Sequence, residues 1–197
     1  MKSEFQTKTK LNGHEGKFLA AKTISSLINA EQHMVHIEPK TIYTYMKHGL
    51  ATWLVDSDGN VGGFIKAMPW HPNLVQVEGG MEKIEAAAIQ NIDKDITPTG
   101  IESGSLLVPP QFRKHGYGTL LKDQLSKQIL TKYPGVPLFS VVDKENTTSI
   151  HLNQKMVWIQ LNPLQMDSLM SVVGIDILQG WDAHIFLHPD CLPIIQQ

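Results

Sequence analysis

One segment of the chain, residues 100–142, constrains the fold more than any other. It contains an apolar strand that ends at Val108, a basic turn with two glycines, an amphipathic helix and a second apolar strand over residues 136–142. Two strands joined through a single helix run in parallel, because the crossover returns the chain to the same end of the sheet. The segment therefore predicts an α/β fold in which helices flank a mixed central sheet.

The turn between the first strand and the helix has the composition of an anion-binding site. A helix N-terminus leaves backbone N–H groups without acceptors and carries about half a positive charge. Gly116 and Gly118 lack the side chains that would hold an anion away, and positive charge comes from Arg113, Lys114 and His115. We therefore expect a phosphate or pyrophosphate group to bind here, although a plain turn with solvated cations would have the same composition. The N–H groups expected to face it are those around Lys114, Gly116, Gly118 and Thr119.

The turn differs from the two common nucleotide-binding loops. A Walker loop needs Gly-x-x-x-x-Gly-Lys followed by Ser or Thr, and this string does not occur in the chain. A dinucleotide fingerprint needs a third glycine at position 121, which is leucine. Both patterns are excluded, although a nucleotide-phosphate-binding protein that uses this turn in another way stays an alternative.

At this point the chain resembles the GNAT superfamily of acyl-CoA-dependent N-acyltransferases. The signature loop of that family is Gln/Arg-x-x-Gly-x-Gly/Ala between a strand and a long helix, and residues 113–118 read Arg-x-x-Gly-x-Gly in that setting. A later family pattern, Asn and then Ala/Ser-x-x-Leu-Tyr-x-Lys-x-Gly-Phe, is matched at Asn146, Ser149, Leu152, Lys155 and Trp158. Asn153 stands where a tyrosine is usual and Val157 where a glycine is usual. The resemblance covers about residues 50–161.

The resemblance implies a single N-acetyltransferase-like domain over residues 1–197, with residues 162–197 as a C-terminal strand and loop. Its central sheet would have two splayed parallel strands in the middle. The resemblance also implies acetyl-CoA as the acyl donor, with the pyrophosphate on the turn and the pantetheine arm paired to the strand backbone. The residues implied in binding it are Leu106, Leu107, Val108, Arg113, Lys114, His115, Gly116, Tyr117, Gly118, Thr119 and Asn146. Asn146 has a second interpretation as a helix cap.

Transfer to an amine needs a general base, because an ammonium ion cannot attack a carbonyl group. Glu102 lies six residues before Val108, and this even spacing predicts that the two side chains share one face of the strand. Glu102 also matches a glutamate that the family often uses as the base, directly or through water; Asp143 and Glu145 are the alternatives. The resemblance further implies that the N–H near Val108 polarises the thioester carbonyl, as in an oxyanion hole.

Asn153 bears on the choice between two functions. Its amide can hydrogen-bond to sulfur, but it has no proton to release to the leaving thiolate, which the family's tyrosine can protonate. Water, Ser149 or another group would then protonate the thiolate. We interpret the chain as an N-acetyltransferase that moves an acetyl group from acetyl-CoA to a primary amine of a small molecule or peptide. A catalytically silent acyl-CoA-binding regulatory module stays an alternative, because the tyrosine is absent.

Composition argues against several other classes of function. The formal net charge of −2 is unlike that of a nucleic-acid binder, which is normally well above zero. No apolar run is long enough for a membrane span, and the single Cys191 cannot form an internal disulfide, so we expect a cytoplasmic protein. No metal site is expected, because the histidine pairs lack a third ligand; they are His33 with His36 and His184 with His188. The acceptor and the formation of a homodimer are left open.

Periodicity and turn residues predict the other elements of the chain. Helices are expected over residues 16–30, 39–49 and 81–92, from the basic turn to Tyr133, and over 147–156. Strands are expected over residues 50–56, 61–68, 100–108, 136–142, 157–161 and 181–187, with a first strand of weaker signal over 5–11. Residues 164–178 fit either a helix or a folded loop. Among the acidic residues that would suit a cationic acceptor are Glu38, Glu78, Glu82 and Glu85.

Overall fold

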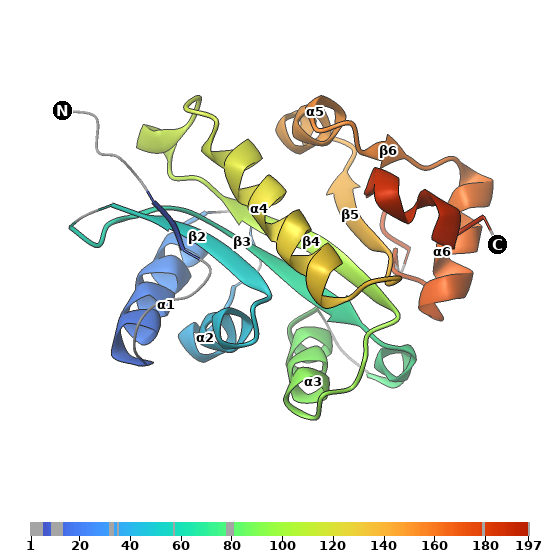
Figure 1. Cartoon of the computed structure of the whole chain (residues 1–197), viewed down its shortest axis with the longest axis horizontal. Coiled ribbons are helices and arrows are strands. Elements are labelled where there is room, and N and C mark those ends of the chain that lie inside the picture. The colour runs from blue at the N-terminus through green and yellow to red at the C-terminus, as the bar shows by residue number, and fades with distance from the viewer. Residues whose placement is uncertain are drawn as a thin grey trace.

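The computed structural model describes residues 6–8, 14–31, 34, 36–56, 58–77, 81–178 and 180–196, with the backbone alone at 6–8, 14, 15, 75 and 82. Within these residues, seven strands form one sheet in the order β1-β2-β3-β4-β5-β7-β6 (Figure 1). The strands are β1 (Gln6–Lys8), β2 (Ala51–Val55), β3 (Val61–Trp70), β4 (Gly100–Leu107), β5 (Leu138–Asp143), β6 (Ile159–Gln160) and β7 (Ala183–Leu187). Only β4 and β5 are parallel neighbours, as the single-helix crossover predicts.

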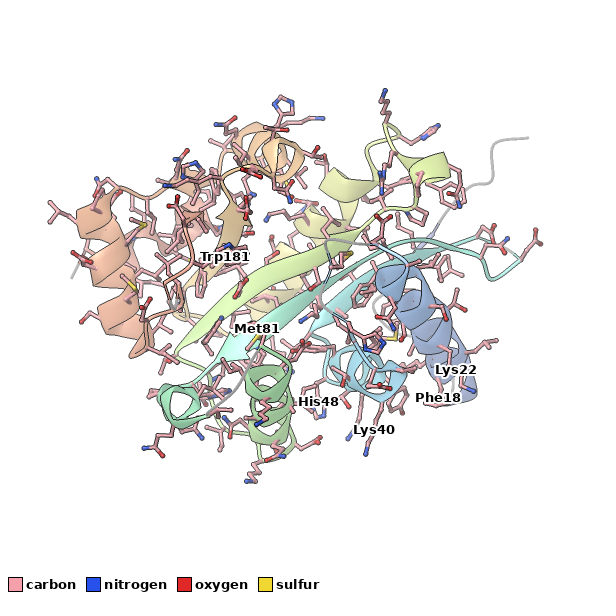
Figure 2. All side chains as sticks on the ribbon, turned by 180° about the vertical axis from the view of Figure 1, so that it is seen from behind. Phe18, Lys22, Lys40, His48, Met81 and Trp181 are labelled. Atoms are coloured by element: carbon pink, nitrogen blue, oxygen red, sulfur yellow. The ribbon has the colours of Figure 1, made fainter. Side chains whose placement is uncertain are left out.

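Helices cover both faces of this sheet. They are α1 (His14–Asn29), α2 (Pro39–Lys47), α3 (Met81–Asp93), α4 (Tyr117–Lys132), α5 (Thr147–Lys155) and α6 (Pro163–Val173). The helices α1, α2 and α3 lie on one face, seen in front in Figure 2, and α4 lies on the opposite face, seen in front in Figure 1. This arrangement confirms the expected α/β fold with a mixed central sheet flanked by helices.

The apolar positions explain why the layers pack. Every residue of β3 is buried, because helices cover both of its faces. On α4, the predicted apolar positions Leu121, Leu125 and Ile129 are completely buried against the sheet. Burying each such side chain contributes roughly 1.5–3 kcal/mol relative to leaving it exposed. The four-residue spacing in the sequence therefore correctly identified the inner face of this helix.

The two parallel strands part soon after they begin. They pair at two positions only, Ile101 with Leu138 and Glu102 with Phe139. One further link crosses between them, where Ser140 Oγ donates a hydrogen bond to the Ser103 carbonyl at 2.9 Å. Residues 104–106 are partly exposed although they lie in the middle of the sheet. The splayed middle strands expected from the resemblance are therefore present.

Several expected boundaries differ from the structure. The strand β4 ends at Leu107, and α4 begins only at Tyr117, so the basic turn is a true loop. The strand expected from residue 157 begins at Ile159, because residues 156–158 form the turn that follows α5. Residues 164–178 divide into α6 and a loop, and β7 begins two residues later than expected. Most of the expected first strand, including residues 5 and 9–11, lies outside the described residues.

Candidate active site

The loop between β4 and α4 has an unusual backbone. After a short 3-10 turn at Pro110–Phe112, Lys114 and Gly116 both adopt left-handed conformations, with φ of 65° and 81°. Left-handed residues alternating with other conformations turn successive N–H groups to one side, which is how anion-binding nests are built. A lysine in the left-handed region of backbone conformation is uncommon, and this conformation costs energy. A loop that only joined the strand to the helix would not need such a conformation.

Among the described residues, no side chain caps the first turn of α4. Its N-cap is Gly116, which has no side chain to accept a hydrogen bond, and no acidic residue lies in the first turn. The helical ladder begins where the Leu120 N–H donates to the Gly116 carbonyl at 3.0 Å. The positive end of a 16-residue helix is therefore not neutralised by an acidic side chain in its first turn.

Gly118 is not required by the packing of the protein itself. A Cβ atom at this position would lie 3.5 Å from Leu106 Cδ2 and 3.9 Å from Leu152 Cδ2, which are ordinary contacts. The same contacts show that the N-terminus of α4, the end of β4 and the helix α5 converge. The absence of a side chain at Gly118 leaves space at this meeting point.

The structure gives Arg113 and His115 partners within the protein. Arg113 Nε donates to the Val108 carbonyl at 2.9 Å, and its Nη2 pairs with Glu31 Oε1 at 2.9 Å. His115 Nδ1 lies 2.8 Å from the Arg113 carbonyl. The sequence suggested mobile positive charge at these positions. Arg113 instead ties the loop to the segment after α1, and Lys114 is the exposed cation of the turn for which no such partner is seen among the described residues.

Glu102 and Val108 lie on opposite faces of β4, contrary to the expectation from their even spacing. Phe64 pairs with Leu107 and Lys66 pairs with Gly104, so one intervening residue of β3 opposes two residues of β4. The extra residue forms a bulge that contains Ser105, whose φ is 51°. A bulge reverses the alternation of side chains, and Val108 consequently faces α4, with its Cγ2 3.5 Å from a Cβ built at Gly63.

Glu102 is held in a partly buried position next to an indole. Trp70 Nε1 donates to Glu102 Oε2 at 3.0 Å. Burial raises the pKa of Glu102, and the Trp70 hydrogen bond together with the charges of Lys66 and Lys122 partly opposes this rise. The pKa is thereby moved toward neutrality, as a general base needs. The alternatives are placed differently: Glu145 is exposed, and Asp143 Oδ1 accepts from the Glu145 N–H at 2.7 Å.

A buried ion pair lies on the same face of the sheet as Glu102. Lys66 Nζ contacts Glu85 Oε1 of α3 at 2.6 Å, both side chains are less than a tenth exposed, and the ammonium also lies 4.9 Å from the Tyr45 ring centre. Glu85 therefore already has a cationic partner and is not free for a cationic acceptor. Lys66 was not among the site residues expected from the sequence, although a lysine inside an otherwise apolar strand is a visible signal. Of the other acidic residues named above, Glu38 is exposed, whereas Glu78 and the Glu82 side chain lie outside the described residues.

The helix α5 presents Asn153 to the interior. Asn146 caps this helix by accepting from the Ser149 N–H at 3.0 Å, which confirms the helix-cap interpretation. Asn153 is 1% exposed, and its Nδ2 donates to the Ser149 carbonyl at 2.8 Å. Its Oδ1 and the Ser103 Oγ are buried without hydrogen-bond partners among the described residues. Such groups are costly unless a ligand or water satisfies them.

A Schellman motif ends α5 and fixes the position of Trp158. The Trp158 N–H donates to the Asn153 carbonyl at 3.0 Å and the Val157 N–H donates to the Gln154 carbonyl at 3.0 Å. Val157 has a φ of 60° at the position where this motif prefers glycine. The family's usual glycine therefore has a backbone role, and the valine here adopts the same conformation under strain.

Lys122 is a second residue of the candidate site, after Lys66, that was not predicted from the sequence. It lies on α4 and is 3% exposed, with Nζ 3.8 Å from the Trp158 ring centre. Burial lowers the pKa of Lys122 to about 7, and the negative charge of Glu102 partly opposes this shift. A lysine on an amphipathic helix is ordinarily solvated, so the sequence gives no signal for its burial.

The histidines expected not to hold a metal are used in other ways. His184 Nδ1 lies 3.1 Å from Gln160 Nε2, and His188 packs edge-on to Trp158 at 5.4 Å between ring centres. His33 lies outside the described residues. Within the described ranges, no group of three or more His, Cys, Asp and Glu side chains is arranged to hold a metal ion. None of the described helices is long and apolar enough to span a bilayer.

Comparison with known proteins agrees with this fold. A family model described as FR47-like protein matches residues 81–163, from the start of α3 to the start of α6. No curated protein sequence matches the chain significantly. Solved structures do match: diaminobutyrate acetyltransferase EctA from Paenibacillus lautus, bound to L-2,4-diaminobutyric acid and coenzyme A, is 15% identical with a TM-score of 0.54, and the match covers 94% of both chains.

Two further solved structures have the same fold along nearly their whole length. Arabidopsis thaliana NAA60 in complex with acetyl-CoA is 14% identical, with a TM-score of 0.57 and a match covering 94% of this chain and 98% of that one. The polyamine N-acetyltransferase of Drosophila melanogaster is 13% identical, with a TM-score of 0.56 and coverage of 94% and 99%. At such identities the likeness is one of fold. Together with the family model, it confirms the resemblance to the GNAT superfamily.

Proposed function

We propose that this protein transfers an acetyl group from acetyl-CoA to a primary amine by direct attack of the amine on the thioester. One observation carries the proposal: the uncapped start of α4 adjoins the gap where β4 and β5 part. The first feature suits a pyrophosphate, and the second suits an extended arm with amide groups. A nucleotide without such an arm would use only the first feature.

The residues that would hold the donor follow from the site geometry. The pyrophosphate would lie on the N–H groups of residues 114–119, where Gly118 leaves room beside Leu106 and Leu152. The peptide groups of residues 104–106, which β5 does not cover, would pair with the pantetheine amides. The buried Ser103 Oγ and Asn153 Oδ1 would then gain partners. Main-chain N–H groups near Val108 would polarise the thioester carbonyl.

Glu102 would take the proton from the acceptor amine. Its side chain faces the layer of α1, α2 and α3, so the amine would approach from that side. The Lys66–Glu85 pair is internally neutral, which leaves Glu102 as the carboxylate that attracts an ammonium group. A raised pKa makes Glu102 a stronger proton acceptor than an exposed glutamate. Small diamines and peptide N-termini are both consistent with this chemistry.

Ligand-induced stabilisation tests the donor. We expect CoA and acetyl-CoA to raise the unfolding temperature, with a gain of about 2.7 kcal/mol at 100 times the dissociation constant. ATP and NAD should stabilise the protein less at equal concentration. Preferential stabilisation by ATP or NAD would instead indicate a nucleotide-phosphate-binding protein.

Thiol release over a panel of amines tests the transfer itself. Glu102→Gln should lower the rate with the best amine by about 100-fold or more, while stabilisation by CoA is retained. Asp143→Asn is the matched control on the neighbouring strand and should leave the rate within a few-fold of the wild-type rate.

Because Asn153 replaces the family's tyrosine, a silent acyl-CoA-binding module is the second candidate function. Stabilisation by acetyl-CoA without thiol release across the panel would favour that module.

A further inference from the structure

Lys122 occupies a place where a charged side chain has little access to water. It lies on α4 four residues after Gly118, and residues at this spacing share one helix face. A side chain at Gly118 would touch Leu106 of β4 and Leu152 of α5, so this face of α4 looks toward the gap between the strands. Lys122 is therefore one helical turn, about 6 Å, further along that gap than the glycine turn.

The ammonium group of Lys122 has an aromatic partner but no carboxylate partner. Its Nζ lies over the Trp158 ring, and it makes no hydrogen bond or ion pair within the described part of the chain. The titratable groups of other elements that interact electrostatically with it are Glu102 of β4 and His188 after β7, and Asp123 adjoins it on α4 itself. A buried ammonium with spare N–H donors is able to receive a ligand atom.

The acid and base candidates stand on opposite sides of the sheet. Glu102 faces the layer of α1, α2 and α3, whereas Lys122 belongs to α4 on the other face. The strands part immediately after Glu102, so a thioester in the gap would have a carboxylate on one side and an ammonium on the other.

We propose that Lys122 is the catalytic residue that donates a proton to the sulfur of coenzyme A as the acetyl group is transferred. This inference rests on the proposed function. It gives Lys122 the part that the usual tyrosine of the resembling family would have at Asn153. Asn153 itself has no proton to release, and one of its N–H groups is engaged by the Ser149 carbonyl.

The protons and electrons balance in this step. The neutral amine, after Glu102 has removed its ammonium proton, forms a bond to the carbonyl carbon. The carbon–sulfur bond breaks, its electron pair moves to sulfur, and Lys122 Nζ gives sulfur one proton. The nitrogen that becomes the amide loses one proton, which returns through solvent to the neutral Lys122, and Glu102 releases the ammonium proton to solvent. The products are the N-acetyl amine and the free thiol.

The acidity of Lys122 suits proton transfer to the sulfur of coenzyme A. An alkyl thiol such as cysteine has a pKa of about 8.5 and an ordinary lysine about 10.4, so an ordinary lysine would not protonate a thiolate readily. Burial lowers the pKa of Lys122 to about 7, which makes the transfer downhill. Burial also lowers the pKa of His188, which leaves that residue largely neutral at pH 7 and a weaker candidate.

A binding experiment tests the contact with sulfur without any acceptor amine. The affinities of CoA and of desulfo-CoA, which lacks the sulfur atom, are measured by calorimetry for wild type, Lys122→Met and Lys127→Met. We expect wild type to prefer CoA by about 10-fold, because a charge-assisted hydrogen bond is lost in the analogue. Lys122→Met should bind both equally. Lys127→Met, which removes an exposed lysine of the same helix, should behave like wild type.

A kinetic experiment separates proton donation from charge. Lys122→Met and Lys122→Arg should both slow thiol release by about 100-fold, because arginine keeps the charge but cannot release a proton. The wild-type rate should fall as the pH rises through about 7 and Lys122 loses its proton, and this limb should be absent in Lys122→Met. Melting curves of both variants check that the fold is intact.

The outcomes distinguish the two proposals. If wild type binds neither CoA nor desulfo-CoA, the proposed function fails and this inference fails with it. If wild type binds both equally, or if Lys122→Arg retains the wild-type rate, Lys122 is not the proton donor, while binding of the acyl donor stands.

Discussion

The helices α4 and α6 begin in opposite ways. At α6, Asn162 Oδ1 accepts from the Gln165 N–H at 3.0 Å and Gln165 Oε1 accepts from the Asn162 N–H at 3.1 Å, a complete capping box. At α4, a glycine stands at the cap, no acidic residue follows in the first turn, and one turn later the helix buries a lysine. Proteins break local rules mainly where function requires it, so from this contrast we expect the functional helix to be α4.

The largest expected effect on stability comes from removing the buried charge of α4. Lys122→Met should raise the free energy of unfolding at pH 7 by about 4 kcal/mol, because the pKa of Lys122 is lowered from 10.5 to about 7 and each pKa unit is worth about 1.4 kcal/mol. The pKa of Lys122 is lowered in the folded state, so between about pH 7 and pH 10.5 the unfolded chain binds more protons. Wild-type stability therefore rises with pH in this window, and the advantage of the variant disappears toward its upper end. Urea unfolding at several pH values measures this, and an advantage that does not change with pH would contradict it.

The next effect concerns the space that α4 leaves at its start. Gly118→Val should reduce the affinity for CoA by about 100-fold, which corresponds to about 2.7 kcal/mol, because a branched side chain fills the pyrophosphate turn. Gly118→Ala is the control variant with a smaller side chain. Its Cβ makes only ordinary contacts, so the fold should be as stable as wild type or slightly more so. Calorimetric titration and melting curves separate the two properties, and unchanged affinity in Gly118→Val would remove the glycine turn from the site.

An acidic residue in the first turn should make α4 more like α6 and damage the site. Thr119→Glu would stabilise the fold by about 0.3–1 kcal/mol, because a negative charge favours a helix N-terminus. The same charge would repel a pyrophosphate and lower the affinity for CoA by about 10-fold. Thr119→Gln is the neutral control and should keep most of the affinity. Increased stability with normal CoA binding would show that the open N-terminus serves no ligand.

The reciprocal change at α6 should affect stability alone. Asn162→Ala removes the capping box and should cost about 1 kcal/mol of unfolding free energy. Affinity for CoA should stay at the wild-type value, because α6 lies outside the proposed donor site. Parallel denaturation and titration measurements check this expectation. A large loss of CoA affinity would mean that the two helices are not separate in function.

The smallest effect is expected at the end of α5. Val157→Gly should stabilise the protein by about 1 kcal/mol, because glycine adopts the left-handed conformation at position 157 without steric cost. The Val157 side chain is 73% exposed, so little apolar burial is lost. Thermal unfolding measures the gain. A decrease in stability would mean that the Schellman motif does not strain this residue.

Local patterns in the sequence predicted much of the fold and part of the site. The apolar face of α4, the single-helix crossover, the Asn146 cap and the glycine turn all depend on residues close together in the chain. The physical requirements for them, such as a 3.6-residue period or a left-handed backbone, act over a few positions. A sequence can show such requirements without knowledge of any distant partner.

Other features depended on partners that only the folded chain brings together. The predicted face of the Val108 side chain was wrong because the bulge at Ser105 arises from pairing with β3, which lies some 40 positions earlier in the sequence. The burial of Lys122 depends on Trp158, contributed by the end of another helix.

By itself, then, the sequence determined an α/β fold, its parallel crossover and the place where an anion could bind, because these follow from short-range backbone and periodicity constraints. The tertiary structure alone decided which side chains meet across the gap between β4 and β5. Burial and charge at that gap are set by segments far apart in the chain, and their energies do not exist until those segments pack.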